Sequence, residues 1–443
     1  MRRMEVEPTR SGAFRHSTST TRSEALSARA SSALPLLIAL ILFAGCSLPD
    51  RDAALLPGFE EVPSPAAPES GESNLATGSD GEVWMSWIEP EGAAANALRT
   101  ARLDGDRWGP ARTVAEGDSF FVNWADFPSV VPIRPDLLAA HWLVQGPTGG
   151  VDYSIWMAYS EDEGETWTEP WIPHEDGTNT EHGFVSLFPW GEDEVGAVWL
   201  DGRDYARFDE EGGSDADAPP PEMALRFRAF GPGGEPGPKT ILDARVCDCC
   251  QTAVAIPNNG PVVAYRDRSA GEIRDISAVR YEGAGWSEPV TVHPDGWEIP
   301  ACPVNGPAAD AAGGHVVLAW FSAANDTPLV RVAFSRDGGA TFGPPARVDD
   351  GNPAGRVQVR FVDEESAVVS WLERVEGEAQ LRVRRLGLAG GMGRSFRVTE
   401  TDAGRASGFP RMVPLPGERL LFSWTDTREP RQVRTAMTGT PPW

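Results

Sequence analysis

The chain has 443 residues and a formal net charge of −26 at pH 7, with 65 acidic against 39 basic side chains. Its sequence pI is near 4.6, and Lys239 is its only lysine, so nearly all positive charge is arginine. An acidic surface of this kind argues against nucleic acid and anionic lipid as partners. The length suits two or three ordinary domains or one large repeat array.

The N-terminal segment contains an apolar run, LPLLIALILFAG at 34–45, which is too short to span a membrane as a mature helix. Arginines precede the run and Cys46 follows it, and FAGC at 43–46 resembles a bacterial lipobox. The resemblance implies a lipoprotein signal peptide over 1–45, with Cys46 as the lipidated N-terminus. Ser47 resembles the residue that follows the cysteine in outer-membrane lipoproteins. We therefore expect a cell-envelope protein that faces the periplasm or the cell surface and touches the membrane only through its lipid.

Residues 46–75 are rich in Pro, Ala, Glu and Ser and predict a tether, with one strand at LLPGFEEV. Beyond it, an apolar strand that ends in an aromatic residue recurs every 51–66 residues, at Trp87, Trp142, Trp199, Tyr265, Trp320, Trp371 and Trp424. A period near 50 residues, with strands and Gly/Pro turns throughout, is typical of a β-propeller. Residues 76–443 are therefore predicted to form one all-β propeller of seven four-stranded blades.

The seventh copy stops after its third strand, RQVRTAM. The segment LLPGFEEV has the pattern of a fourth strand and could complete that blade from the other end of the chain. Closure of this kind removes exposed sheet edges, so we predict a ring closed by an N-terminal strand.

Two turns share the pattern S-x-D-x-G-x-[TS]-[WF], SEDEGETW at 160–167 and SRDGGATF at 335–342. The aspartate can accept hydrogen bonds from its own turn, the glycine can take a positive φ, and the aromatic ring packs between sheets. Here the chain resembles the Asp-box (BNR) repeats of the sialidase/neuraminidase superfamily. Its segment CDCC at 247–250 resembles a C-x-C-C segment of uncharacterised secreted sialidase-like lipoproteins, which are the most similar group. Sialidases have six blades, which makes six the alternative count. The box residues are Ser160, Asp162, Gly164, Trp167, Ser335, Asp337, Gly339 and Phe342.

In a propeller, the loops between the second and third strands share a face with the links between blades, and the Asp boxes lie on the opposite face. The resemblance implies a sugar carboxylate held by three arginines, an Asp acid and a Tyr nucleophile helped by a Glu. Candidate carboxylate-binding residues are Arg203, Arg266, Arg268 and Arg428, with Asn305 and Trp297 as further substrate contacts. Candidate catalytic residues are Asp126 or Asp204 as acid and Tyr205 or Tyr265 as nucleophile. The alternative is that the Arg–Asp pairs are structural salt bridges.

Four cysteines lie on two neighbouring blade links, Cys247, Cys249 and Cys250 before the fourth blade and Cys302 before the fifth. In an exported chain they predict two disulfides, although adjacent Cys249 and Cys250 do not readily bond each other. The alternatives are a thiolate site for zinc or Cu⁺, with His182 or Asp248 as an extra ligand, and redox chemistry. No cofactor is required by the sequence otherwise.

Three functions remain open from the sequence. The first is a sialidase-like exo-glycosidase whose arginine-rich central pocket takes a carboxylate-bearing sugar. The second is a non-catalytic propeller that binds a glycan, an acidic small molecule or a protein, and the third is a thiolate metal-binding protein of the cell envelope. We expect a monomer in each case. A hydrolase predicts a Tyr–Glu pair facing three converging arginines, whereas a binding module predicts arginines already neutralised in pairs.

Overall fold

The computed structural model describes residues 53–210 and 221–443. The predicted signal peptide and Cys46 lie outside the described residues, as does the start of the predicted tether. Within the described ranges, no helix is long and apolar enough to cross a membrane.

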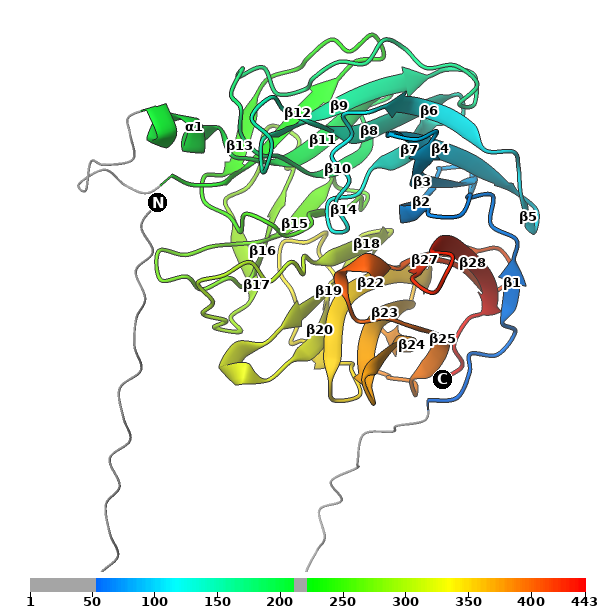
Figure 1. The fold of residues 1–443 in the computed structure, drawn as a ribbon. Coiled ribbons are helices and arrows are strands. Elements are labelled where there is room, and N and C mark those ends of the chain that lie inside the picture. The colour runs from blue at the N-terminus through cyan, green and yellow to red at the C-terminus, as the bar shows by residue number, and fades with distance from the viewer. Residues whose placement is uncertain (1–52, 211–220) are drawn as a thin grey trace, which may run out of the picture. The chain divides into compact units, whose positions relative to one another are not determined.

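Seven antiparallel sheets follow one another around a ring, so the prediction of a seven-bladed propeller is confirmed and the alternative of six is wrong (Figure 1). Blade 1 contains β2 (Gly71–Thr77), β3 (Val83–Glu91), β4 (Ala95–Asp104), β5 (Arg107–Trp108) and β6 (Arg112–Gly117). Blade 2 contains β7 (Ser129–Arg134), β8 (Leu137–Gln145) and β9 (Tyr153–Ser160), and Trp171 pairs with Met157 where a fourth strand would lie. The first inner strand thus starts at Gly71, a little before the predicted boundary at residue 76.

The next three blades each have four strands in sequential order. Blade 3 contains β10 (His182–Trp190), β11 (Glu194–Asp201), β12 (Ala224–Phe230) and β13 (Thr240–Asp243). Blade 4 contains β14 (Ala253–Ala255), β15 (Val262–Arg266), β16 (Ile276–Arg280) and β17 (Val290–His293). Blade 5 contains β18 (Ala308–Ala312), β19 (His315–Ser322), β20 (Leu329–Ser335) and β21 (Ala346–Arg347).

The last two blades bring the chain back to its start. Blade 6 contains β22 (Pro353–Asp363), β23 (Ser366–Val375), β24 (Glu378–Gly387) and β25 (Phe396–Thr401). Blade 7 contains β26 (Arg411–Leu415), β27 (Arg419–Asp426) and β28 (Gln432–Gly439), and its outer strand is β1 (Glu60–Val62). Within residues 53–210 and 221–443, three short helices lie in the connections, α1 (Arg203–Glu210), η1 (Ala324–Asp326) and η2 (Arg405–Ser407).

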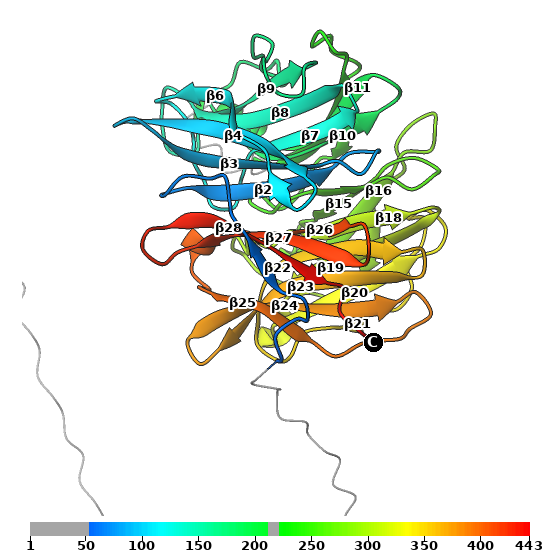
Figure 2. The same cartoon turned by 90° about the vertical axis from the view of Figure 1, so that its right-hand side faces the viewer.

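The ring is closed by the N-terminal strand, as predicted. β1, in blue, lies beside β28, in red, and Glu60 and Val62 pair in antiparallel register with Met437 and Thr435 (Figures 1 and 2). Val62 is buried, and its carbonyl accepts a hydrogen bond from Thr435 Oγ1 at 2.9 Å. Strands from both ends of the described chain therefore stabilise one blade.

The second strands of the blades are mostly apolar and buried because both of their faces are covered by neighbouring blades. β19 shows this clearly, since every residue after His315 is buried. The recurring aromatic residues fill the space between blades, and Trp87, Trp320 and Trp371 are fully buried there.

The two Asp-box turns have the same hydrogen bonds. Asp162 Oδ1 accepts from Thr166 N at 2.8 Å, and Gly164, at φ +82°, donates its N–H to Ser160 Oγ at 2.8 Å. In the second turn Asp337 Oδ1 accepts from Thr341 N at 2.9 Å and Gly339 N donates to Ser335 Oγ at 2.8 Å. Trp167 and Phe342 pack against buried clusters shared by adjacent blades. Each box follows the third strand of its blade, so it lies at the end opposite to the blade links.

Candidate metal centre

The cysteine cluster, which we define as Cys247, Cys249, Cys250 and Cys302, lies on the links that enter blades 4 and 5. The first link is tied to the end of β15 because Cys247 N donates to Arg266 O at 3.0 Å. The second link approaches the same loop because Arg274 N donates to Trp297 O at 2.9 Å. Two links 50 residues apart in the sequence are thus held against one loop, the one that joins β15 and β16.

Three of the sulfur atoms lie within 4.8 Å of one another, those of Cys247, Cys249 and Cys250. Cys247 Sγ and Cys250 Sγ are 3.1 Å apart, and both residues are buried. Cys302 is exposed, and its thiol interacts with that of Cys249. No disulfide joins these four cysteines in the described part of the chain, and the exposed Cys302 gives the cluster one side that solvent can reach.

Two buried arginines lie beside these sulfurs. Arg274 Nη1 donates to Cys247 Sγ at 3.3 Å, and the Arg266 guanidinium acts electrostatically on both Cys247 and Cys250. Burial alone would raise the pKa of the Cys247 thiol, but hydrogen bonds with Cys249 and Cys250 and the charge of Arg266 hold this pKa well below its usual range. A nearby guanidinium favours the thiolate, which is the form of cysteine that binds metal ions.

The two predicted extra ligands differ in their surroundings. Asp248 belongs to the network around the cluster, since its carboxylate lies 3.7 Å from Arg274 Nη1 and accepts from Tyr205 Oη at 3.2 Å. His182 has both ring nitrogens engaged elsewhere, with Thr180 O at 3.0 Å and Asp176 Oδ2 at 3.1 Å. The structure therefore brings Asp248, but not a nitrogen of His182, to the cysteines.

Each arginine predicted to bind a carboxylate already has partners within the protein. Arg203 and Arg428 form two hydrogen bonds each to one aspartate, Asp201 and Asp426. Arg268 Nη2 pairs with Glu272 Oε1 at 2.9 Å. The four lie on blades 3, 4 and 7.

The fourth of these arginines, Arg266, is buried. It donates to the backbone oxygens of Asn305, Arg274 and Phe321, and its guanidinium lies 4.8 Å from the centre of the Trp297 ring. Trp297 is only 6% exposed and packs in the core between blades 5 and 6, so its faces are not open to a sugar. The Asn305 side chain accepts from Arg356 N at 2.8 Å. Arg266, Trp297 and Asn305, which were predicted to contact a substrate, instead connect neighbouring blade links to one another.

The structure brings one predicted acid, Asp126, next to a tyrosine that was not predicted. Tyr153 Oη lies 3.0 Å from Asp126 Oδ2 and 2.7 Å from Glu181 Oε1. The single hydroxyl hydrogen of Tyr153 can be donated to only one carboxylate. Both hydrogen bonds are therefore formed when protonated Asp126 donates to Tyr153 and Tyr153 donates to Glu181. Burial raises the pKa of Asp126 to about 8 and that of Glu181 to about 7, in agreement with a shared proton.

The remaining catalytic candidates lie apart from this trio. Tyr265 is buried and donates to Asp243 Oδ2 at 2.6 Å, and Tyr205 is half-buried beside Asp248. Asp204 lies in the first turn of α1. Tyr153 is 1% exposed, and burial raises its pKa well above the usual range, so its oxygen is a hydrogen-bonding group of the core. Sequence reasoning missed Tyr153 because only the fold brings it next to Asp126 and Glu181.

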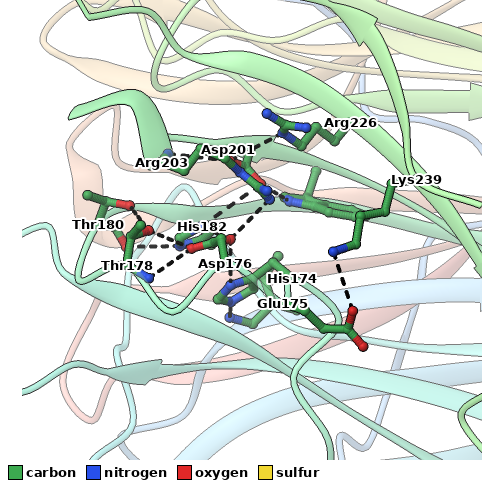
Figure 3. Close-up of polar contacts among 12 residues, drawn as sticks. His174, Glu175, Asp176, Thr178, Thr180, His182, Asp201, Arg203, Arg226 and Lys239 are labelled. Carbon is green, nitrogen blue, oxygen red and sulfur yellow. Dashed lines mark hydrogen bonds and ion pairs between the residues drawn. The ribbon is translucent and has the colours of Figure 1, made fainter. Parts of the chain in front are cut away.

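A second cluster with ligand-type residues contains His174, Asp176 and His182, joined to Asp201 and Arg203 (Figure 3). The two imidazole rings are stacked with centres 3.7 Å apart and planes within 6°. A metal ion bound through a ring nitrogen lies close to the plane of that ring, and parallel stacked rings have no such point in common. Arg203 Nη2 already lies 3.0 Å from Asp176 Oδ2, so this cluster is an ion-pair network rather than a metal site.

Comparisons with known proteins do not name a family. No family model matches the chain, and no curated protein matches it. Among solved structures, the Hadza microbial sialidase Hz136 is 15% identical over 68% of this chain, with a TM-score of 0.42, and the chain spans 63% of its length. An α-L-arabinanase of Penicillium chrysogenum is 13% identical over 88% of this chain and 99% of its own, with a TM-score of 0.45. The phage phi92 endosialidase is 10% identical over 88% of this chain and 69% of its own, with a TM-score of 0.43. These identities and TM-scores are too low to transfer an activity.

Proposed function

We propose that this protein is a cell-envelope propeller that binds a thiophilic metal ion, Zn²⁺ or Cu⁺, in the cysteine cluster. The observation that carries the proposal is the convergence of Cys247, Cys249 and Cys250 within 4.8 Å, with the Cys302 thiol next to that of Cys249. Sets of three or four thiolates select zinc and Cu⁺ over harder ions. The exposed Cys302 provides a route by which the ion enters and leaves.

Charge balance supports the same reading. Three thiolates with Cu⁺, or four with Zn²⁺, leave a net charge of −2 at the site. A buried charge of this size needs compensation, and the buried guanidinium groups of Arg266 and Arg274 supply two positive charges beside the sulfurs. With two neutral disulfides Arg274 would keep its pair with Glu272, but Arg266, for which no acidic partner occurs among the described residues, would have no counter-charge.

The glycosidase hypothesis finds less support. Binding of a sugar carboxylate in the sialidase manner needs three arginines open to substrate, and the four predicted here are occupied by acidic groups or backbone oxygens. The Tyr153–Glu181 contact fits a hydrolase, but the hydroxyl is buried. Arginines that are already paired with acidic groups agree with the hypothesis of a non-catalytic binding propeller. Among possible ligands of such a propeller we propose a metal ion, because the cysteine cluster supplies side chains that can coordinate one.

The test measures metal and thiols in the mature protein purified without oxygen. We expect about one equivalent of Zn²⁺ or Cu⁺ by elemental mass spectrometry and sulfur-only coordination by X-ray absorption. A coordination number of three with copper would assign Cys247, Cys249 and Cys250 as the ligands, and four with zinc would add Cys302. Cys249→Ser should lose the metal, and Ser287→Ala, a substitution at a half-buried position on the same blade that leaves every cysteine in place, should keep it. A protein with no titratable thiol and no bound metal would overturn the proposal. So would hydrolysis of a fluorogenic sialoside, measured as release of its fluorophore.

A further inference from the structure

The inner strands of all seven blades surround a central channel (Figure 1). A cavity of about 260 Å³ lies in it and is lined from every blade. A second cavity of about 590 Å³ adjoins it toward the Asp-box face, and the two share Arg360, Thr77, Val254 and Ala309. None of these residues belongs to the cysteine cluster, so the channel is a separate feature.

Arg411, the first residue of β26, lines this channel and has no acidic partner among the described residues. Its Nε donates to Asn74 Oδ1 at 2.8 Å, and its guanidinium lies 4.2 Å from the centre of the Phe127 ring. Among the described residues, no carboxylate lies within ion-pair distance of it. Arg411 is half-buried, and a half-buried cation without a counter-charge is costly, because an amide oxygen and an aromatic face compensate only part of the lost hydration.

A second arginine reaches the same cavity from β22. Arg360 Nη1 donates to the backbone oxygens of Ala309 and Val359, at 3.1 and 3.0 Å. Its charge acts on Arg411, whose pKa is lowered to about 9 by burial and by this like charge. It also acts on Asp310, although no carboxylate within the described ranges forms an ion pair with Arg360. Asp310 Oδ2 is itself engaged by Phe361 N at 2.7 Å.

The other titratable groups that line the smaller cavity are neutral near pH 7. Burial raises the pKa of Asp126 to about 8, and burial lowers that of His141 to about 3. Asp310 lines only the larger cavity. The smaller cavity therefore holds two like charges, in a chain whose net charge is −26.

The geometry points to a binding site for a small oxyanion in the central channel, between Arg411 and Arg360. Guanidinium groups bind phosphate, sulfate and carboxylate through paired N–H donors, and Arg411 has its terminal nitrogens available for this. A cavity of about 260 Å³ is large enough for an inorganic oxyanion or a short carboxylic acid. This site lies on the inner strands of blades 6 and 7, whereas the proposed metal ions bind on the links to blades 4 and 5.

Titration calorimetry of the full mature protein with sodium phosphate, sodium sulfate and sodium acetate tests the site, with sodium chloride at matched ionic strength as the reference. We expect saturable binding of at least one of the three, and at least a tenfold loss of affinity in Arg411→Gln. Arg394→Gln is the matched control, because Arg394 also stacks on a phenylalanine, 4.5 Å from the Phe396 ring, but is exposed on blade 6. Binding of phosphate and sulfate alone would identify an inorganic oxyanion, and binding of acetate alone would identify a carboxylic acid.

The same titrations can overturn the inference. Phosphate and sulfate stabilise many proteins without binding a site, so saturable binding heat, and not a rise in melting temperature, is the measurement. Equal affinity in Arg411→Gln and Arg394→Gln, or no saturable binding of any of the three anions, would refute it. If Arg411→Gln does not fold, Arg411→Lys replaces it, because lysine keeps the positive charge but lacks the paired N–H donors of the guanidinium group. Unchanged anion affinity in both Arg411→Lys and Arg360→Gln would then refute the inference.

Discussion

Arg274 donates a hydrogen bond from Nη1 to Cys247 Sγ over 3.3 Å, and both side chains are buried. The contact joins the loop after β15 to the link before β14, and it places a permanent positive charge against the sulfur. Arg274 Nη2 also pairs with Glu272 Oε2 at 2.9 Å, which fixes the orientation of the guanidinium. The two contacts hold the Cys247 sulfur in a position set by two separate segments and favour its thiolate form.

Replacing Arg274 by glutamine should weaken metal binding without removing a ligand. Partners of metal ligands typically contribute about 10–100-fold to affinity, so we expect a loss of that size in competition with a chromogenic chelator. Arg280→Gln is the control, because Arg280 is on the same blade and pairs with Glu282 near the surface. Equal affinity in the two variants would show that Arg274 does not act on the site.

Asp126 should make folding stability depend on pH. Its pKa is about 8 in the folded protein against an ordinary value of 3.8, so between these values the folded state binds a proton that the unfolded state does not. Stability therefore falls as pH rises from about 4 to about 8, by roughly 1.4 kcal/mol per pH unit for this group. In Asp126→Asn the amide can donate to Tyr153 as the protonated acid does, and this slope should disappear.

Urea unfolding at pH 5, 6, 7 and 8 checks this prediction. The difference in free energy of unfolding between wild type and Asp126→Asn should change by about 4 kcal/mol across this range. Asp162→Asn serves as control, because Asp162 is an exposed turn residue whose hydrogen bonds with Thr166 lower its pKa. A constant difference for Asp126→Asn would mean that Asp126 is ionised throughout.

Trp297 should contribute to stability rather than to ligand binding. Its ring is buried between blades 5 and 6 and stacks under Arg266, so Trp297→Ala should cost about 3–5 kcal/mol of unfolding free energy. Trp443→Ala, which removes a 61% exposed ring, should cost about 1 kcal/mol or less. A small effect at Trp297, measured by denaturant unfolding, would reopen its role as a sugar-stacking residue.

The closing strand should be essential to the stability of blade 7. Val62→Asp puts a charge at a buried position of β1 and should detach the strand from β28, at a cost of about 2–4 kcal/mol. Glu60→Lys changes charge at an exposed position of the same strand and should have little effect. Hydrogen exchange at the β28 amides reads the contact directly, and unchanged protection in Val62→Asp would contradict this account of closure.

Lipidation at Cys46 remains a prediction of the sequence. Cys46→Ala should release the protein from the membrane fraction, because a lipid attached to this residue is the only membrane attachment that we expect. Detergent partitioning of cells expressing the full chain separates the two forms. Membrane association that survives Cys46→Ala would show another mode of attachment.

Much of the fold was predictable from the chain, because blade architecture depends on local patterns that repeat. The aromatic-ended strands gave seven copies, and the incomplete last copy, together with LLPGFEEV, predicted the partner of β28. The cysteine links were expected to be neighbours from their order alone. The short helix α1, in the loop after β11, was not predicted, and neither was the reduction of the fourth strand in blade 2 to one bridge.

By itself the sequence determined the repeat, the number of blades and the residues that face the same end, since each of these follows from strand order and hydrophobic pattern. Only the tertiary structure decided which charges meet. Arg203 and Arg428 are paired with aspartates two residues before them, whereas Arg411, in an apolar strand, lines a channel and has no acidic partner within the described ranges. The reason is physical: a side chain's partners are set by packing between blades that are distant in sequence, and no local pattern records them.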